Sequence, residues 1–413
     1  MSNDEALVHS DHHAYKEHPY RFVVLFFTVI LNFYMGTFPT AFTPIASVVS
    51  KLLDINQETV LLSSAVYLLG NVLFCPIVFY VMQSKGLRNT VLISVALCVL
   101  GASTRMMNIF AGQLILGMGS SLVTNVQMEF CFEWFSPHNR PLYITVVAIA
   151  NIFGGGFGNL VPLVFVDDEG TDLLELSSQF QSYLFYTFLL FFLMMILCLL
   201  FFKDKPPKGF GYLHPPKIEK HSLFFYCKKG FKRPQFINLL ILYIIGNANL
   251  IVLGSIINDL VIAFNFSSVN GSIAAVVVIF SGVASAVIYS LFFIESQFQS
   301  GKVTVLLAGA IWSVFGSIVT LKFGIFAGFL AGMSLFGIFS FPILPVSMEL
   351  LTRNFEDIPP YATNAMLMIG AQFLAFVIQI LTTKTGVSQN FSVMICITMW
   401  SYFACFFPAR KID

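Results

Sequence analysis

Long apolar runs recur along almost the whole chain, and they constrain its fold more than any other feature. Each run holds about 20 residues, the length that an α-helix needs to cross the hydrocarbon core of a bilayer. Only 10% of the 413 residues are charged, whereas soluble domains carry about 25%. The sequence therefore predicts an all-α integral membrane protein. Twelve transmembrane helices are predicted, over residues 22–49, 58–82, 90–106, 109–134, 141–166, 180–202, 236–262, 269–294, 303–322, 325–351, 360–383 and 390–407.

The second half of the chain repeats features of the first half at a constant offset. The aligned pairs are Met128 with Met348, Glu129 with Glu349, Phe135 with Phe355, Ile152 with Gln372, and Phe153 with Phe373. Two related halves with a substrate site between them are typical of secondary transporters with the major facilitator fold. The prediction is therefore two six-helix bundles. The expected parts are an N-terminal tail (1–20), a first bundle (21–203), a basic linker (204–233), a second bundle (234–407) and a C-terminal tail (408–413).

The basic residues predict how the chain lies in the membrane. If the amino terminus is cytosolic, 18 of the 22 Lys and Arg residues fall on the inner side. Such a bias is the positive-inside signal. Both termini are therefore expected in the cytosol, in the plasma membrane or an endomembrane.

Motifs of catalysis and metal binding are missing from the sequence. It contains no G-x-x-x-x-G-K-[ST], H-E-x-x-H or G-x-S-x-G pattern, so an enzyme is not expected. The His residues of the first 20 residues are irregularly spaced and have no Cys among them. We therefore predict a solvated tail rather than a metal site, and no cofactor.

Several predicted spans carry uncharged amide side chains, which are candidates for a solute site. They are Asn32, Asn151, Asn247, Asn249, Asn364 and Gln372. Each can equally form an interhelical hydrogen bond, worth about 0.6 kcal/mol on average. We predict that Asn151, Gln372, Asn247 and Asn249 line a central substrate-binding cavity, since the repeat places the first two at nearly equivalent depth.

Acidic residues lie near the predicted cytosolic ends of spans four and ten. Glu129 and Glu133 are four residues apart on one helix face, and Glu349 is the repeat partner of Glu129. Ionisable residues within spans are costly and usually functional. We predict an inner gate in which these acids pair with Arg140 or Arg353, with coupling to protons or cations as the alternative role.

Three stretches resemble the feline leukaemia virus subgroup C receptor-related family of major facilitators. The segment Asn151-x-x-Gly154-x-x-x-Gly158-x-Leu160-Val161-Pro162 is similar to that family's N-Q-L-G-x-x-x-G-x-L-V-P motif. Residues 341–350 with Gly370-Ala371-Gln372, and residues 243–259, resemble its tenth, eleventh and seventh spans. Weaker support comes from Gly86-Leu87-Arg88, which resembles the superfamily signature after span two.

The resemblance implies a carrier for choline and ethanolamine, for haem, or for a vitamin such as pyridoxine. The choline-binding members have an aromatic box with Gln residues in spans five and eleven. Here Gln372 remains, whereas Ile152 and Ile251 replace the fifth-span Gln and seventh-span Tyr, and the first-span Trp falls near Pro39. A quaternary ammonium group needs aromatic faces, which weakens choline as the substrate. Tyr34 or Phe38 would have to substitute.

The function predicted from the sequence is secondary transport of a small organic solute by alternating access. The alternative is a non-transporting membrane receptor, or a complex subunit that retains the fold. The expected partners are the solute and membrane lipids, with no nucleic acid, and the expected state is a monomer.

Overall fold

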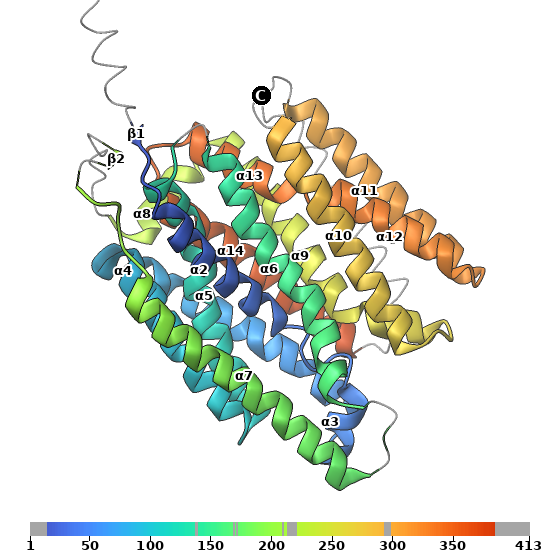
Figure 1. Ribbon diagram of the computed structural model, residues 1–413. Helices are drawn as coiled ribbons and strands as arrows, with labels where there is room; N and C mark the ends of the chain where they lie inside the picture. The colour runs from blue at the N-terminus through green and yellow to red at the C-terminus, as the bar shows by residue number, and fades with distance from the viewer. Residues whose placement is uncertain are drawn as a thin grey trace, which may run out of the picture.

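The computed structural model describes residues 15–136, 139–167, 170, 172–208, 210–212, 221–292 and 299–384 (Figure 1). Its first-half helices are α2 (Arg21–Thr37), α3 (Ala46–Leu53), α4 (Gln57–Arg105), α5 (Ile109–Trp134), α6 (Arg140–Phe165) and α7 (Leu173–Phe201). Its second-half helices are α8 (Leu223–Gly230), α9 (Pro234–Ala263), α10 (Ser268–Phe292), α11 (Gln299–Lys322), α12 (Phe326–Ser340), α13 (Ile343–Asn354) and α14 (Pro360–Lys384). Two-residue strands β1 (Tyr15–Lys16) and β2 (Gly211–Tyr212) pair antiparallel.

The helices confirm the all-α membrane class. Within the described residues, nine helices are long and apolar enough to cross a membrane. One of them, α4, has two limbs, which correspond to the second and third predicted spans. Gly86, at φ 78°, reverses the chain between the two limbs. The predicted twelfth span, 390–407, lies outside the described residues.

Proline breaks divide the first and tenth spans, as the sequence predicts. Helix α2 ends before Pro39 and α3 starts after Pro44, while α12 and α13 meet at Pro342. The breaks face the protein interior, since Phe38 and Phe341 beside them are each 1% exposed. Buried surroundings are the condition under which a broken helix is tolerated at membrane depth.

Two ends of the molecule can be distinguished. Strands β1 and β2 and helix α8 lie at one end, which we call the linker end, and α3 lies at the other, which we call the opposite end (Figure 1). Helices α4 and α5 pack extensively with each other, as do α2 and α6, α11 and α12, and α10 and α12. Between the halves, α14 contacts α4 and α5, and α10 contacts α6.

Helices α2 and α6 approach each other closely through glycines. A Cβ on Gly154 would meet the Phe33 carbonyl oxygen, and one on Gly36 would meet the Asn151 carbonyl oxygen. Small residues of this kind allow membrane helices to bring their backbones together. Gly154 and Gly36 therefore let the backbones of α2 and α6 pack directly against each other.

Arg105 is a buried cation at the end of α4. Its side chain is 1% exposed, and its guanidinium lies 5.3 Å from the Phe38 ring centroid, 4.5 Å from Phe42 and 6.0 Å from Tyr183. Three aromatic faces stabilise the buried cation. This cluster joins α4, α7 and the break after α2 at the opposite end.

The segment before α2 is bound to the linker end of the first bundle. The Glu17 carboxylate accepts hydrogen bonds from Ser136 Oγ at 2.8 Å and Asn139 Nδ2 at 2.9 Å, and it pairs with Arg21. Burial raises the pKa of Glu17, but the hydrogen bonds from Arg21, Asn139 and Ser136 outweigh it and lower the pKa to about 2. Glu17 therefore stays ionised and holds this segment against the α5–α6 turn.

An ion-pair cluster joins the start of α9 to the α13–α14 turn. Asp357 accepts from both terminal nitrogens of Arg233, at 2.7 and 2.6 Å, and pairs with Lys229 at 3.0 Å. The hydrogen bonds from Arg233 are the main reason that the pKa of Asp357 falls from 3.8 to about 2. Bidentate Arg–carboxylate pairs of this kind favour one fixed geometry.

Asp357→Asn is expected to lower the melting temperature at pH 7, and by less as the medium is acidified. Because the folded pKa is depressed, the pair stabilises the fold above the ordinary pKa, and this contribution is lost as the pH falls from 3.8 through about 2. Since water reaches the pair, the loss should be about 1 kcal/mol or less. Thermal unfolding from pH 7 to pH 3 measures it, with the neighbouring Glu356→Gln as control. A pH-independent difference would contradict this role.

Candidate functional site

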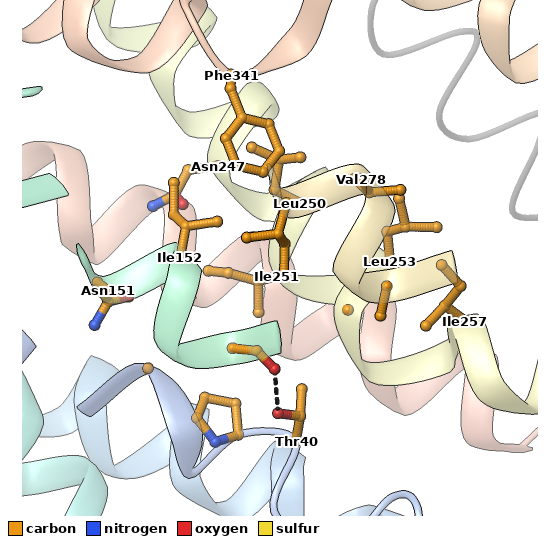
Figure 2. Close-up of a pocket in the computed structure, with 16 residues that line it drawn as sticks. Thr40, Asn151, Ile152, Asn247, Leu250, Ile251, Leu253, Ile257, Val278 and Phe341 are labelled. Carbon is orange, nitrogen blue, oxygen red and sulfur yellow. Dashed lines mark hydrogen bonds between the residues drawn. The ribbon is translucent and has the colours of Figure 1, made fainter. Parts of the chain in front are cut away.

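A cavity of about 660 Å³ lies between the two halves. Its lining residues come from α2 and the break after it, α6, α9, α10 and the α12–α13 break: Gly36, Pro39, Thr40, Asn151, Ile152, Gly155, Asn247, Leu250, Ile251, Leu253, Gly254, Ile257, Ala275, Val278, Ile279 and Phe341. Figure 2 shows that aliphatic side chains make up most of this wall. We call this space the apolar chamber.

A second cavity of about 390 Å³ adjoins the apolar chamber. The two share Asn151, Ile152, Asn247 and Ile251. The second is further lined by Thr124, Gln127, Ala148, Tyr243, Leu344, Met368 and Gln372. We call it the polar chamber, because amide and hydroxyl groups make up much of its wall.

The structure brings together three of the four residues predicted to bind substrate. Asn151 and Asn247 line both chambers, and Gln372 lines the polar chamber. The fourth, Asn249, is 5% exposed on α9 and is not among the lining residues of either chamber. Ile251, two residues further along α9, lines both chambers.

The amides differ in how their hydrogen-bonding groups are used. Asn151 Nδ2 donates to the Asn32 carbonyl oxygen of α2 at 3.1 Å, and Figure 2 shows this side chain turned away from Ile251. Asn247 Nδ2 lies 3.5 Å from the Tyr243 hydroxyl, a long hydrogen bond. Gln372 Oε1 is buried and accepts no hydrogen bond from the described residues.

The repeat pair Ile152 and Gln372 meets at the polar chamber. The corresponding positions of the two halves therefore face one space from opposite sides. One is apolar and the other carries an amide, so the chamber is chemically asymmetric.

The predicted gate residues lie toward the linker end, outside both chambers. The charges of Glu133, Lys205 and Arg140 act on the Glu129 carboxyl, and Glu133 pairs with Lys205 at 3.3 Å. Arg140 and Glu349, from opposite halves, both act electrostatically on the Cys131 thiol between them. The Arg140 guanidinium lies 4.4 Å from the Phe132 ring centroid.

Arg353 is the predicted gate residue that the structure leaves at the surface. It lies in the last turn of α13 with an exposed side chain. Glu349, one turn earlier on the same helix, is 8% exposed. The acid therefore lies within the bundle while the base lies outside it.

Interhelical contacts join the two halves on the linker side of the chambers. Asn364 Nδ2 on α14 donates to the Thr124 carbonyl oxygen on α5 at 2.7 Å. The Thr145 and Ser290 hydroxyls, on α6 and α10, lie 2.6 Å apart. The Phe79 and Tyr361 rings pack at 5.4 Å.

Toward the opposite end, two hydrogen bonds between the halves in the described part of the chain are long. Asn159 Nδ2 lies 3.5 Å from the Gly254 carbonyl oxygen, and Ser272 Oγ lies 3.5 Å from the Asn159 carbonyl oxygen. These distances are at the limit of hydrogen bonding. Within the described residues, the hydrogen bonds that join the halves are therefore shorter on the linker side than toward the opposite end.

Sequence reasoning missed several lining residues, among them Thr40, Phe341, Gln127 and Tyr243. A signal existed for the first two, because each adjoins a proline break that was expected to face the interior. Thr40 Oγ1 donates to the Gly155 carbonyl oxygen at 3.0 Å, as Figure 2 shows. Gln127 also carried a signal, as an uncharged amide within the predicted span 109–134, whereas no comparable signal marks Tyr243.

Curated relatives carry a solute carrier name. "Solute carrier family 49 member 4 homolog" of Xenopus tropicalis is 26% identical over an alignment of 208 residues. The alignment covers 45% of this chain and 45% of that protein. The protein of the same name from Xenopus laevis is 28% identical over 152 residues, 32% of this chain and 33% of that protein. The chain thus aligns with less than half the length of each. This naming agrees with the resemblance to the feline leukaemia virus subgroup C receptor-related family.

Solved transporter structures share the fold at low sequence identity. The fucose transporter FucP in its outward conformation matches with a TM-score of 0.66 at 14% identity, over 95% of this chain and 99% of that chain. The proton:xylose symporter XylE bound to 6-bromo-6-deoxy-D-glucose matches with a TM-score of 0.70 at 11% identity, over 95% and 96%. The sequence model of the Major Facilitator Superfamily matches residues 24–365. The chain therefore belongs to the major facilitator superfamily.

Proposed function

We propose that the chain is a secondary transporter that moves a small organic solute by alternating access. The observation that carries the proposal is the pair of joined chambers at the interface between the two halves, which is where this fold binds its substrates. Asn247 and Gln372 contribute polar groups to that space, and Asn151 contributes to its wall. Asn249 on α9 lies outside the walls of both chambers.

Glu129, Glu349, Arg140 and Arg353 are proposed to act in the gate rather than in solute binding. Support comes from the position of the first three around the α5, α6 and α13 contact, on the linker side of the chambers. Arg353 would join the gate when the linker end rearranges, because it is exposed in the present conformation. The Glu129 carboxyl is hydrogen-bonded by the Tyr361 backbone of the other half, so separation of the halves would break this contact.

A receptor or complex subunit with the same fold remains the alternative function. A specific observation favours transport over this alternative. The chambers lie between halves whose hydrogen bonds are 2.6 and 2.7 Å long on the linker side and 3.5 Å long toward the opposite end, among the described residues. A protein that only retained the fold would have no need for this asymmetry. The family resemblance suggests choline, ethanolamine, haem and pyridoxine as solutes to test, and the largely apolar wall of the apolar chamber adds an uncharged alcohol to that set.

Uptake of labelled candidate solutes into proteoliposomes tests the proposal. At least one solute should accumulate above the level of protein-free liposomes. Ile251→Trp should reduce that uptake to background, because the larger side chain fills space shared by both chambers. Ile262→Trp, at a 49% exposed position of the same helix, should retain it. Equal uptake by the two variants would contradict a pathway through the chambers.

A further inference from the structure

We propose that the joined chambers select an uncharged solute with a largely apolar body and a single hydrogen-bond donor. The apolar chamber would take the body, and Gln372 Oε1 in the polar chamber would accept from the donor. The inference rests on the proposed transport function and adds the substrate class to it.

The first argument comes from the wall of the apolar chamber. Its aliphatic lining residues are drawn from three helices, α6, α9 and α10, and Ile152, Leu250 and Ile251 project from the first two of them (Figure 2). Its hydroxyl group, on Thr40, already donates to the Gly155 carbonyl oxygen. The amides Asn151 and Asn247 lie where this wall is shared with the polar chamber. The rest of the wall is apolar with its hydroxyl group satisfied, and it favours an apolar occupant.

The second argument comes from the unsatisfied acceptor in the polar chamber. Gln372 Oε1 is shielded from solvent without a hydrogen-bond partner among the described residues. Buried acceptors are nearly always paired in native proteins. A hydroxyl or amide N–H on the solute would provide the missing donor.

The third argument is the lack of charge around the chambers. Among the described residues, no Asp, Glu, Lys or Arg lines either chamber. Glu129 and Glu349 lie toward the linker end, outside both chambers, and interact with other groups there. An ion that entered the chambers would lose its hydration without gaining a counterion, which strongly disfavours it.

A fourth argument concerns the aromatic groups that a quaternary ammonium ion would need. The rings of Phe38 and Tyr34, the two candidates to replace the missing aromatic residues of the choline box, make contacts with other side chains. The Phe38 ring faces the Arg105 guanidinium at 5.3 Å, and the Tyr34 ring packs against Phe191 at 5.8 Å. Phe341 and Tyr243 remain, one in each chamber, and two separate rings do not form a box.

Four probes with one carbon skeleton test this selection on the purified full chain in nanodiscs. They are 4-phenylbutan-1-ol, its methyl ether, 4-phenylbutanoate and 4-phenylbutyltrimethylammonium. The tritiated alcohol is measured by equilibrium binding, with empty nanodiscs subtracted, and the others compete with it. The alcohol should bind roughly tenfold more tightly than the ether, which lacks the donor. Both ions should compete more weakly than the ether.

Two variants separate the role of Gln372 from a general effect of the substitution. Gln372→Leu should abolish the preference for the alcohol over the ether while leaving ether binding in place. Gln379→Leu makes the same change on the same helix outside both chambers and should keep the preference. Binding of either ion as tight as that of the alcohol would overturn the inference, as would a preference that survives Gln372→Leu.

The test also distinguishes failure of this inference from failure of the proposed function. If none of the four probes binds, while the cavity opens alternately to the two sides of the membrane, the substrate class is wrong and the transport proposal stands. If the cavity does not open alternately, the transport proposal fails whatever the probes do. In either case, the preference for the alcohol over the ether and the ions, and its loss in Gln372→Leu, decides whether the inferred substrate class is right.

Discussion

Gly154→Ala is expected to lower the free energy of unfolding by about 3 kcal/mol. The added methyl group would overlap the Phe33 carbonyl oxygen, and it would lie 3.1 Å from the Gly36 Cα atom. Both neighbours belong to the backbone of α2 and cannot rotate away. The two helices would have to separate along a contact that also forms part of the cavity wall, so solute binding should weaken as well.

Gly155→Ala provides a matched control one residue further along. Its added methyl group would have its nearest neighbour, the Gly36 carbonyl oxygen, at 3.7 Å, which is an ordinary van der Waals contact. Within a helix, alanine is favoured over glycine by about 0.5–1 kcal/mol. The melting temperature should therefore fall for Gly154→Ala and stay level or rise for Gly155→Ala. Equal melting temperatures would show that α2 and α6 do not pack as described.

A disulfide between residues 145 and 290 is expected to stop solute turnover. The Thr145 and Ser290 hydroxyl oxygens lie 2.6 Å apart, close to the sulfur separation of about 2.05 Å in a disulfide. Oxidation of Thr145→Cys/Ser290→Cys would hold α6 and α10 together on the linker side, and transport requires this side to open. Uptake should fall to background on oxidation and return on reduction. Each single variant, treated with the same oxidant, should keep its uptake.

The bounds of several transmembrane helices could be predicted closely from the sequence, because a helix that crosses a bilayer needs a run of about 20 predominantly apolar residues. Helix α5 runs over Ile109–Trp134 as expected, and α6 over Arg140–Phe165 is displaced by a single residue. The proline breaks were predictable too, because proline lacks the backbone donor that a continuous helix needs. The chain reversal between the second and third spans was expected as a loop, and it occurs at Gly86, whose backbone dihedrals are not helical.

The cavity could be predicted only in part, because its lining depends on the rotation of each helix about its axis. Asn247 and Asn249 are two residues apart and thus lie on different faces of α9, and only the first reaches the chambers. The burial of Arg105 was also not predictable, since it requires rings from α7 and the break after α2 to meet around one side chain. Contacts between distant segments decide such features.

The most direct test of alternating access follows a cysteine at residue 152, which lines both chambers. Ile152→Cys is placed in the Thr145→Cys/Ser290→Cys chain, and a membrane-impermeant thiol reagent is added to one face of sealed vesicles at a time. In the reduced protein, the reagent should reach residue 152 from both faces. After the disulfide forms, it should reach residue 152 only from the face at the opposite end. Labelling from a single face in the reduced protein, or labelling from the linker-end face after the disulfide has formed, would contradict transport through this cavity.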